Sequence, residues 1–172
     1  MHPLRRFLRG LGHDAHGWNL GRNRGDVNGQ VEAAFAQVRG HHERTGQQVS
    51  LVGWSLGGVF AREIARDEPD MVDRVITFGT PIVGGPRYTR SARSYEPEQL
   101  DQIETQVDER NLVPIVNRIT VMYSKADGVV DWRACIDDIN PTVENIEVRS
   151  THAGMIIDPD VWEIIGNRLA KG

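Results

Sequence analysis

The sequence has 172 residues, 39% of them hydrophobic, and a formal net charge of −4. This length suffices for one well-buried core and is too short for two ordinary domains, so we expect a single domain over residues 1–172. The acidic balance gives no electrostatic reason to expect nucleic acid as a partner, and a single cysteine, Cys135, excludes an internal disulfide. Without a membrane-length apolar run or the apolar core of a secretion signal, the sequence predicts a cytoplasmic protein with no membrane span.

Segments with helical spacing of apolar residues alternate along the chain with short apolar runs. The helical spacing predicts helices over about 4–11, 27–38, 56–68, 97–111 and 161–169. The apolar runs predict strands over 13–18, 48–53, 74–79, 118–124 and 145–149. Gly40 should weaken the second helix near its end. This alternation predicts an α/β fold, with a mostly parallel sheet covered by helices on both faces.

The segment 82–117 differs in composition from the rest of the chain. It combines a glycine-rich start, several arginines and a polar helix with scattered apolar side chains, namely Tyr88, Tyr95, Leu112, Val113 and Ile115. We expect it to leave the sheet as an insertion. It is either a lid or cap over an apolar acyl site or a plain surface insertion, and the sequence does not decide between them.

The strand predicted at 48–53 ends in Gly53-Trp54-Ser55-Leu56-Gly57, directly before a helix. A serine at a sharp strand-to-helix turn adopts a strained backbone, and flanking glycines remove the clashes that side chains would cause. The turn exposes the Ser55 hydroxyl and directs the N–H group of Leu56 toward negative charge that develops beside it. Ser55 is therefore a candidate nucleophile, although a glycine-rich turn with a helix-capping serine is the structural alternative.

A nucleophilic serine needs a histidine as base and a carboxylate to orient that histidine. His152 alone among six histidines follows a predicted strand and precedes the last helix, and Asp127 begins the turn after another strand. Asp131, the second candidate acid, is better placed to cap the helix that begins at Trp132. Because Ser55, Asp127 and His152 all follow strands of a parallel sheet, we expect them on one edge of it.

These motifs resemble the α/β-hydrolase superfamily, in particular its small lipase-like and esterase-like members. The resemblance rests on the Gly53–Gly58 elbow, the Tyr-Ser-Lys-Ala-Asp-Gly-Val-Val run that holds Asp127, and the Ser-Thr-His-Ala-Gly run that holds His152. It covers about residues 4–169 and implies a minimal hydrolase fold, with 82–117 in the place of a short lid or cap. It also implies a Ser55–His152–Asp127 catalytic triad.

The sequence departs from this superfamily at its start. Members normally carry an earlier strand and a loop that supplies one of two oxyanion donors, and here only Leu56 is evident as a donor. One missing donor costs about 3 kcal/mol of transition-state stabilisation. We expect that Met1 is an internal methionine of a longer protein; the alternatives are a substitute donor from the loop 20–23, or a fold that has lost efficient catalysis. An exposed sheet edge would also invite pairing with a second copy of the chain.

The sequence thus predicts a serine hydrolase that cleaves carboxylic esters with an apolar acyl group through an acyl-enzyme. The alternatives are an acyltransferase or thioesterase that uses the same three residues, and a catalytically impaired binding protein on this fold. Trp54, beside the nucleophile, is a candidate for narrowing the substrate pocket as well as for core packing. We expect no cofactor and no metal, since His41 and His42 are adjacent rather than four residues apart.

Overall fold

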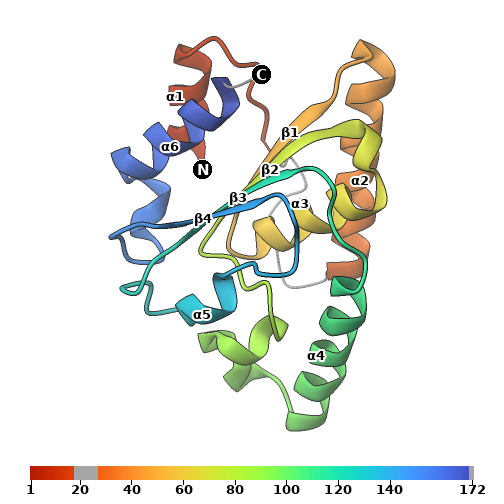
Figure 1. Cartoon of the computed structure of the whole chain (residues 1–172), viewed down its shortest axis with the longest axis vertical. Coiled ribbons are helices and arrows are strands. Elements are labelled where there is room, and N and C mark those ends of the chain that lie inside the picture. Colours follow the sequence, from red (N-terminus) through yellow and green to blue (C-terminus); the bar gives the residue numbers. More distant parts are fainter. Residues whose placement is uncertain (18–26, 171–172) are drawn as a thin grey trace.

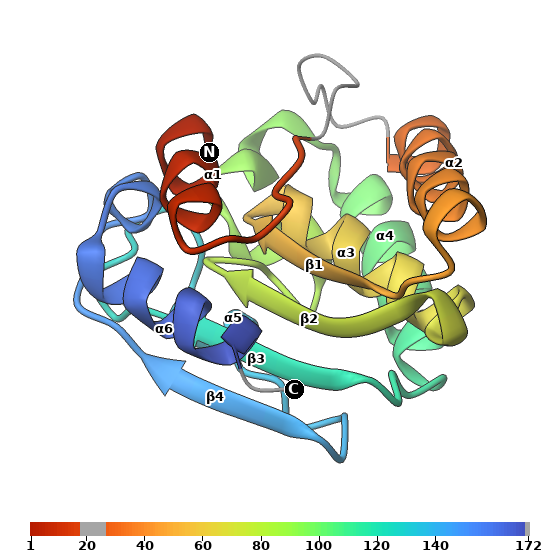
Figure 2. The same ribbon diagram turned by 90° about the horizontal axis from the view of Figure 1, so that it is seen from above.

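The computed structural model describes residues 1–17 and 27–170. Its sheet has four strands in the order β1-β2-β3-β4, and every neighbouring pair is parallel. The strands are β1 (Val49–Trp54), β2 (Val72–Phe78), β3 (Arg118–Tyr123) and β4 (Val143–Glu147). Because all strands run the same way, their carboxyl ends share one edge of the sheet, as Figure 2 shows.

Helices cover both faces of this sheet (Figures 1 and 2). One face carries α1 (His2–Gly10) and α6 (Pro159–Ala170), whose Phe7 and Trp162 rings lie 5.5 Å apart. The other face carries α2 (Val27–Thr45) and α3 (Leu56–Asp67). A helix of one turn, α5 (Trp132–Cys135), lies between β3 and β4 in the chain. The predicted α/β architecture is confirmed.

Two hydrophobic cores lie on the two faces of the sheet. Alternate residues of a strand point to opposite faces, so Leu51 contributes to the core under α2 and α3, whereas Val52 contributes to the core under α1 and α6. The same alternation separates Val121 from Met122 in β3. Burial on both faces explains why the central strands read as nearly continuous apolar runs.

Two predictions about secondary structure are wrong. Residues 13–17 form no strand, because the His13 N–H bonds back to the carbonyl of Leu8 and the Ala15 N–H bonds to His13 in local turns; Trp18 lies outside the described residues. The second helix, predicted over 27–38, extends past Gly40 to Thr45. A glycine costs a helix about 1 kcal/mol, and burial of the face that includes Phe35 offsets it.

The segment 82–117 leaves the sheet as predicted and contains three helical elements. These are the short 3₁₀ helices η2 (Gly85–Tyr88) and η3 (Arg90–Ser94) and the helix α4 (Pro97–Asn111). The apolar side of α4 packs against η2, where a Cβ added to Gly85 would lie 3.0 Å from Ile103. Arg110 of α4 forms ion pairs with Glu63 at 2.6 Å and Asp67 at 2.7 Å, which tie the segment to α3.

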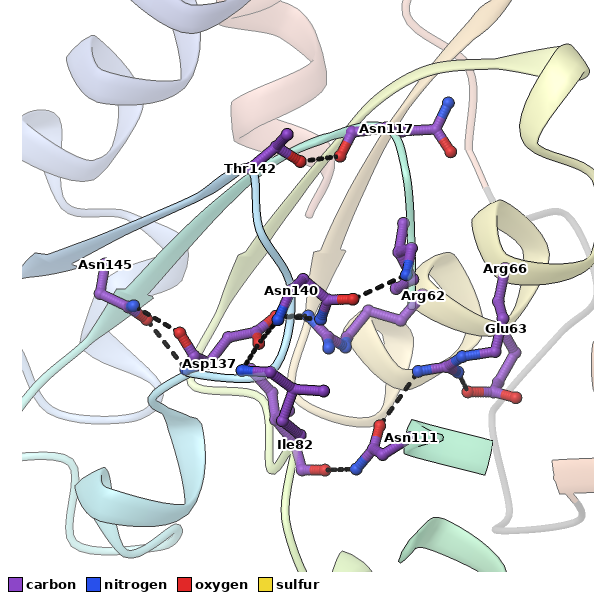
Figure 3. A network of polar contacts seen from close by, with 12 residues as sticks. Arg62, Glu63, Arg66, Ile82, Asn111, Asn117, Asp137, Asn140, Thr142 and Asn145 are labelled. Atoms are coloured by element: carbon purple, nitrogen blue, oxygen red, sulfur yellow. Dashed lines mark hydrogen bonds and ion pairs between the residues drawn. The ribbon is translucent and has the colours of Figure 1, made fainter. Parts of the chain in front are cut away.

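A buried polar network joins α3 to the loop before β4 (Figure 3). The Arg62 guanidinium donates to the Asp137 carboxylate at 2.7 Å, and both side chains are almost completely buried. Asp137 also accepts bonds from the main-chain N–H groups of Ile139 and Asn140. The Asn140 side chain in turn accepts a bond of 2.6 Å from the Ile115 N–H. The network therefore ties Ile115, near the end of the 82–117 segment, to the loop before β4.

No helix within residues 1–17 and 27–170 is long and apolar enough to cross a membrane.

Candidate active site

Ser55 occupies the turn between β1 and α3. Its φ of 54° and ψ of −129° place it in a strained region of backbone space, and it is the only non-glycine residue with positive φ among the described residues. Its N–H donates to the Phe78 carbonyl at 3.0 Å, and its own carbonyl accepts from the Thr80 hydroxyl at 3.0 Å. Bonds from the end of β2 therefore hold the strained serine in place.

The glycines around Ser55 allow strand and helix to approach closely. A Cβ on Gly53 would lie 2.4 Å from the Gly58 Cα, and a Cβ on Gly58 would lie 2.1 Å from the Thr80 hydroxyl oxygen. Neither distance is sterically possible. By contrast, a Cβ on Gly57 would meet nothing within 4 Å. Gly53 and Gly58, rather than Gly57, are thus the glycines that the packing of this turn requires.

Asp127 and His152 lie in contact although 25 positions separate them. The His152 Nδ1–H donates to Asp127 Oδ2 at 2.8 Å, and the His152 main-chain N–H donates to the Asp127 carbonyl at 3.0 Å. The other carboxylate oxygen accepts from the N–H groups of Val129 and Val130 at 2.9 and 2.7 Å. Both side chains are buried, with exposed fractions of 4% and 6%. Asp127 therefore fixes the orientation of the imidazole ring.

These contacts set the charge of Asp127. Burial by itself acts to raise its pKa, but the hydrogen bonds from His152, Val130 and Val129 outweigh burial, so that the pKa lies below its ordinary value. Asp127 is therefore ionised at neutral pH and only accepts hydrogen bonds. Because the carboxylate can only accept, His152 carries its proton on Nδ1 and its Nε2 is left to accept a proton.

Gly79 joins the serine turn to this pair. It has a φ of 57°, and an added Cβ would lie 3.0 Å from His152 Nδ1 and 3.1 Å from Asp127 Oδ2. The residues on either side of it, Phe78 and Thr80, make the bonds to Ser55. The end of β2 is thus in contact with all three candidate residues. Sequence reasoning missed Gly79 and Thr80, although their place directly after a buried strand was a signal.

Trp54 contacts the segment that holds His152. Its Nε1–H donates to the His152 carbonyl at 3.0 Å, and the two rings lie 5.0 Å apart. Leu56 begins α3, where main-chain N–H groups have no partner within the helix. Asp131 caps α5 by accepting from the Arg133 N–H at 2.9 Å, which confirms the prediction that it has a capping role. The loop 20–23, considered as a source of a second oxyanion donor, lies outside the described residues.

The Ser55 hydroxyl makes no hydrogen bond to His152 within the described part of the chain. In enzymes without bound substrate such bonds are often long and shorten only in the substrate complex. The described residues also contain no group of three or more histidine, cysteine, aspartate or glutamate side chains that could hold a metal ion.

A parallel sheet between helices, a strained serine after one strand and a buried Asp–His pair after two others together define an α/β hydrolase. Within this class the chain belongs to the palmitoyl protein thioesterase family, whose model matches residues 19–126. The match includes Ser55 and ends one position before Asp127. The curated proteins include no match to the sequence.

Solved structures share the fold at low sequence identity. An esterase from Pyrococcus furiosus matches with a TM-score of 0.71 and 17% identity, over 98% of this chain and 75% of that one. Mouse α/β-hydrolase domain-containing protein 10 matches with a TM-score of 0.59 and 17% identity, over 98% and 80%. The type II thioesterase BorB of the borrelidin biosynthetic cluster matches with a TM-score of 0.59 and 18% identity, over 84% and 70%.

Proposed function

We propose that this protein is a serine hydrolase that cleaves carboxylic esters with an apolar acyl group, using Ser55, His152 and Asp127. The observation that carries the proposal is the buried hydrogen bond between His152 and Asp127 at the same sheet edge as the strained serine. A histidine held by a carboxylate at the same sheet edge as a serine hydroxyl is the arrangement that acyl transfer requires.

The reaction proceeds in two steps. In the first, Ser55 Oγ attacks the ester carbonyl carbon, His152 Nε2 takes the hydroxyl proton, and the alcohol leaves with that proton as the C–O bond breaks. In the second, water gives a proton to His152 and attacks the acyl-serine, and the acid is released as Ser55 regains its proton. Asp127 holds His152 throughout and stabilises its positive charge. The Leu56 N–H is the proposed donor to the developing oxyanion.

Thioester hydrolysis is the second candidate, favoured by the family to which the chain belongs. The same three residues serve it, because attack by serine and proton transfer by histidine do not depend on whether oxygen or sulfur leaves. Trp54 and the segment 82–117 remain candidates for lining the acyl site.

Hydrolysis of p-nitrophenyl butyrate by the wild type and by Ser55→Ala tests the proposal. We expect wild-type turnover that the variant lacks, and covalent labelling of Ser55 by a fluorophosphonate probe. Equal background rates in wild type and variant, without labelling, would favour a non-catalytic binding protein. Comparison with the matching butyryl thioester separates the two candidate activities.

A further inference from the structure

A hollow of about 420 Å³ opens where the segment 82–117 meets the turn that holds Asp127. Tyr88, Arg90 and Arg93 line it from one side, and Gly128, Val129 and Asp131 line it from the other. The second wall follows Asp127 directly in the chain. The hollow is therefore lined by residues of the turn whose main-chain N–H groups bond to the Asp127 carboxylate.

Main-chain hydrogen bonds hold the two walls together. The Arg90 N–H donates to the Val129 carbonyl, and the Asp131 N–H donates to the Tyr88 carbonyl, both at 2.8 Å. Between these bonds, Thr89 and Val130 form an antiparallel bridge. The same turn supplies the two N–H groups that bond to Asp127. Main-chain bonds thus fix both walls of the hollow to the turn that follows Asp127, so the hollow is not a gap between independent loops.

The hollow carries an unneutralised pair of positive charges. Arg90 and Arg93 stand three positions apart on the 3₁₀ helix η3, where side chains at this spacing lie one above the other. Both are exposed, and within residues 1–17 and 27–170 no carboxylate forms an ion pair with either. Nearby Arg87, in contrast, pairs with Asp101 and with Glu104.

The one carboxylate in the lining has other partners. Asp131 accepts from the Arg133 N–H as the cap of α5, and its carboxylate lies 3.8 Å from the Arg133 guanidinium. Two guanidinium groups at this spacing without a carboxylate partner repel each other, and an anion that binds both of them removes that repulsion. A phosphate group, with three acceptor oxygens and nearly two negative charges, can accept paired N–H donors from both guanidinium groups, whereas a carboxylate has two oxygens and one charge.

We propose that this hollow binds a phosphate group on the alcohol portion of the substrate ester. The inference rests on the proposed function, in which His152 delivers a proton to the leaving alcohol and so must lie beside it. The walls of the hollow follow β2 and β3 in the chain, so the hollow lies at the carboxyl-terminal edge of the sheet, the edge that also carries Ser55 and His152. An apolar acyl chain gains nothing from two charged side chains in contact with water, so the hollow does not suit the acyl group.

Two esters that differ by one phosphate test this substrate class. 1-Butyrylglycerol and 1-butyrylglycerol 3-phosphate share the acyl group and the ester bond, and kcat/KM is measured for both. We expect wild type to prefer the phosphorylated ester by about tenfold for each arginine engaged, since a charge-assisted hydrogen bond contributes about this factor. Arg90→Gln and Arg93→Gln should each reduce the preference, and the double variant should abolish it.

Arg149→Gln is the matched control, because it removes one exposed arginine shortly after β4 and outside the hollow. It should leave the preference unchanged. Equal kcat/KM values for the two esters in wild type would overturn the inference, as would an equal loss of preference in the control. Raising the salt concentration should weaken the preference, because ions screen exposed charges.

Binding of the product alone keeps this test independent of catalysis. Glycerol 3-phosphate, glycerol and inorganic phosphate are titrated separately into wild type and into the double variant by calorimetry. We expect glycerol 3-phosphate to bind more tightly than glycerol, and the double variant to lose this difference. That result supports a phosphate site in the hollow even if no ester is cleaved and the proposed function fails. If esters are cleaved but glycerol 3-phosphate and glycerol bind equally well, the phosphate site is overturned and the proposed function is not. Inorganic phosphate that binds as tightly as glycerol 3-phosphate would assign the hollow to free phosphate instead and overturn the substrate assignment.

Discussion

The indole N–H of Trp54 donates a hydrogen bond of 3.0 Å to the main-chain carbonyl of His152, and the two rings lie with their centroids 5.0 Å apart. The residue before the candidate nucleophile thus holds the loop that carries the candidate base. This contact joins the first strand of the sheet to the segment after the last strand, and it gives Trp54 a role beyond filling the core.

We expect Trp54→Phe to lower kcat for ester hydrolysis about fivefold, the equivalent of one neutral hydrogen bond. KM should change little, because phenylalanine retains an aromatic ring at this position and the lost bond orients His152 rather than substrate. Steady-state kinetics on p-nitrophenyl butyrate measures both. Trp162→Phe is the control, since the Trp162 indole makes a bond of the same kind, 2.9 Å long, to the Ile156 carbonyl. Equal losses in both variants would mean that Trp54 has only a general structural role.

Gly79→Ala should impair activity more than stability. Alanine at its φ of 57° costs about 1–2 kcal/mol, and the added Cβ would press on both His152 and Asp127. Small displacements of catalytic groups have large effects, so we expect kcat to fall by about tenfold to a hundredfold. Gly46→Ala has the same strain at a φ of 66° but meets nothing within 4 Å. Thermal unfolding should shift similarly in both variants, while only Gly79→Ala loses activity.

Acid should destabilise the protein partly through Asp127. Its pKa is lowered in the folded state, so its contribution to the free energy of unfolding is complete above the pKa of the unfolded chain and is lost as the pH falls through the folded pKa. Asp127→Asn should therefore show a weaker fall in stability than wild type below about pH 4. Urea unfolding at several pH values measures this fall. Asp131→Asn, which retains a helix-capping side chain, should follow wild type.

The Arg62–Asp137 pair should be essential for stability. Asp137→Ala leaves a buried guanidinium without its partner, and breaking such a pair costs about 3–5 kcal/mol. Replacing Arg62 and Asp137 together by methionine and leucine should cost less, because no uncompensated charge remains buried. Urea unfolding provides the free energies. Asp101→Ala, which breaks the exposed pair with Arg87, should have only a small effect. Equal losses for Asp137→Ala and Asp101→Ala would contradict this account.

The sequence by itself determined the α/β class and the local structure of the serine turn. The helix 97–111 was located to the residue. Its helical spacing, Pro97 at its start and the Glu96–Gln99 capping box are all local signals. Gly53-Trp54-Ser55 predicted the strained turn for the same reason, since a backbone without room for a Cβ demands glycine wherever it occurs. The strand expected at 13–18 failed because a short mixed run is also compatible with turns, and in residues 13–17 local hydrogen bonds favour turns.

Only the tertiary structure decided how distant residues meet. The contact between Asp127 and His152, the close approach of Gly79 to both, and the bond from Trp54 all join segments that the fold alone brings together. The order of the parallel strands brings these segments together, and periodicity within one segment does not say which strands are neighbours. The arginine-lined hollow depends in the same way on the bridge between Thr89 and Val130, which lie 41 positions apart in the sequence.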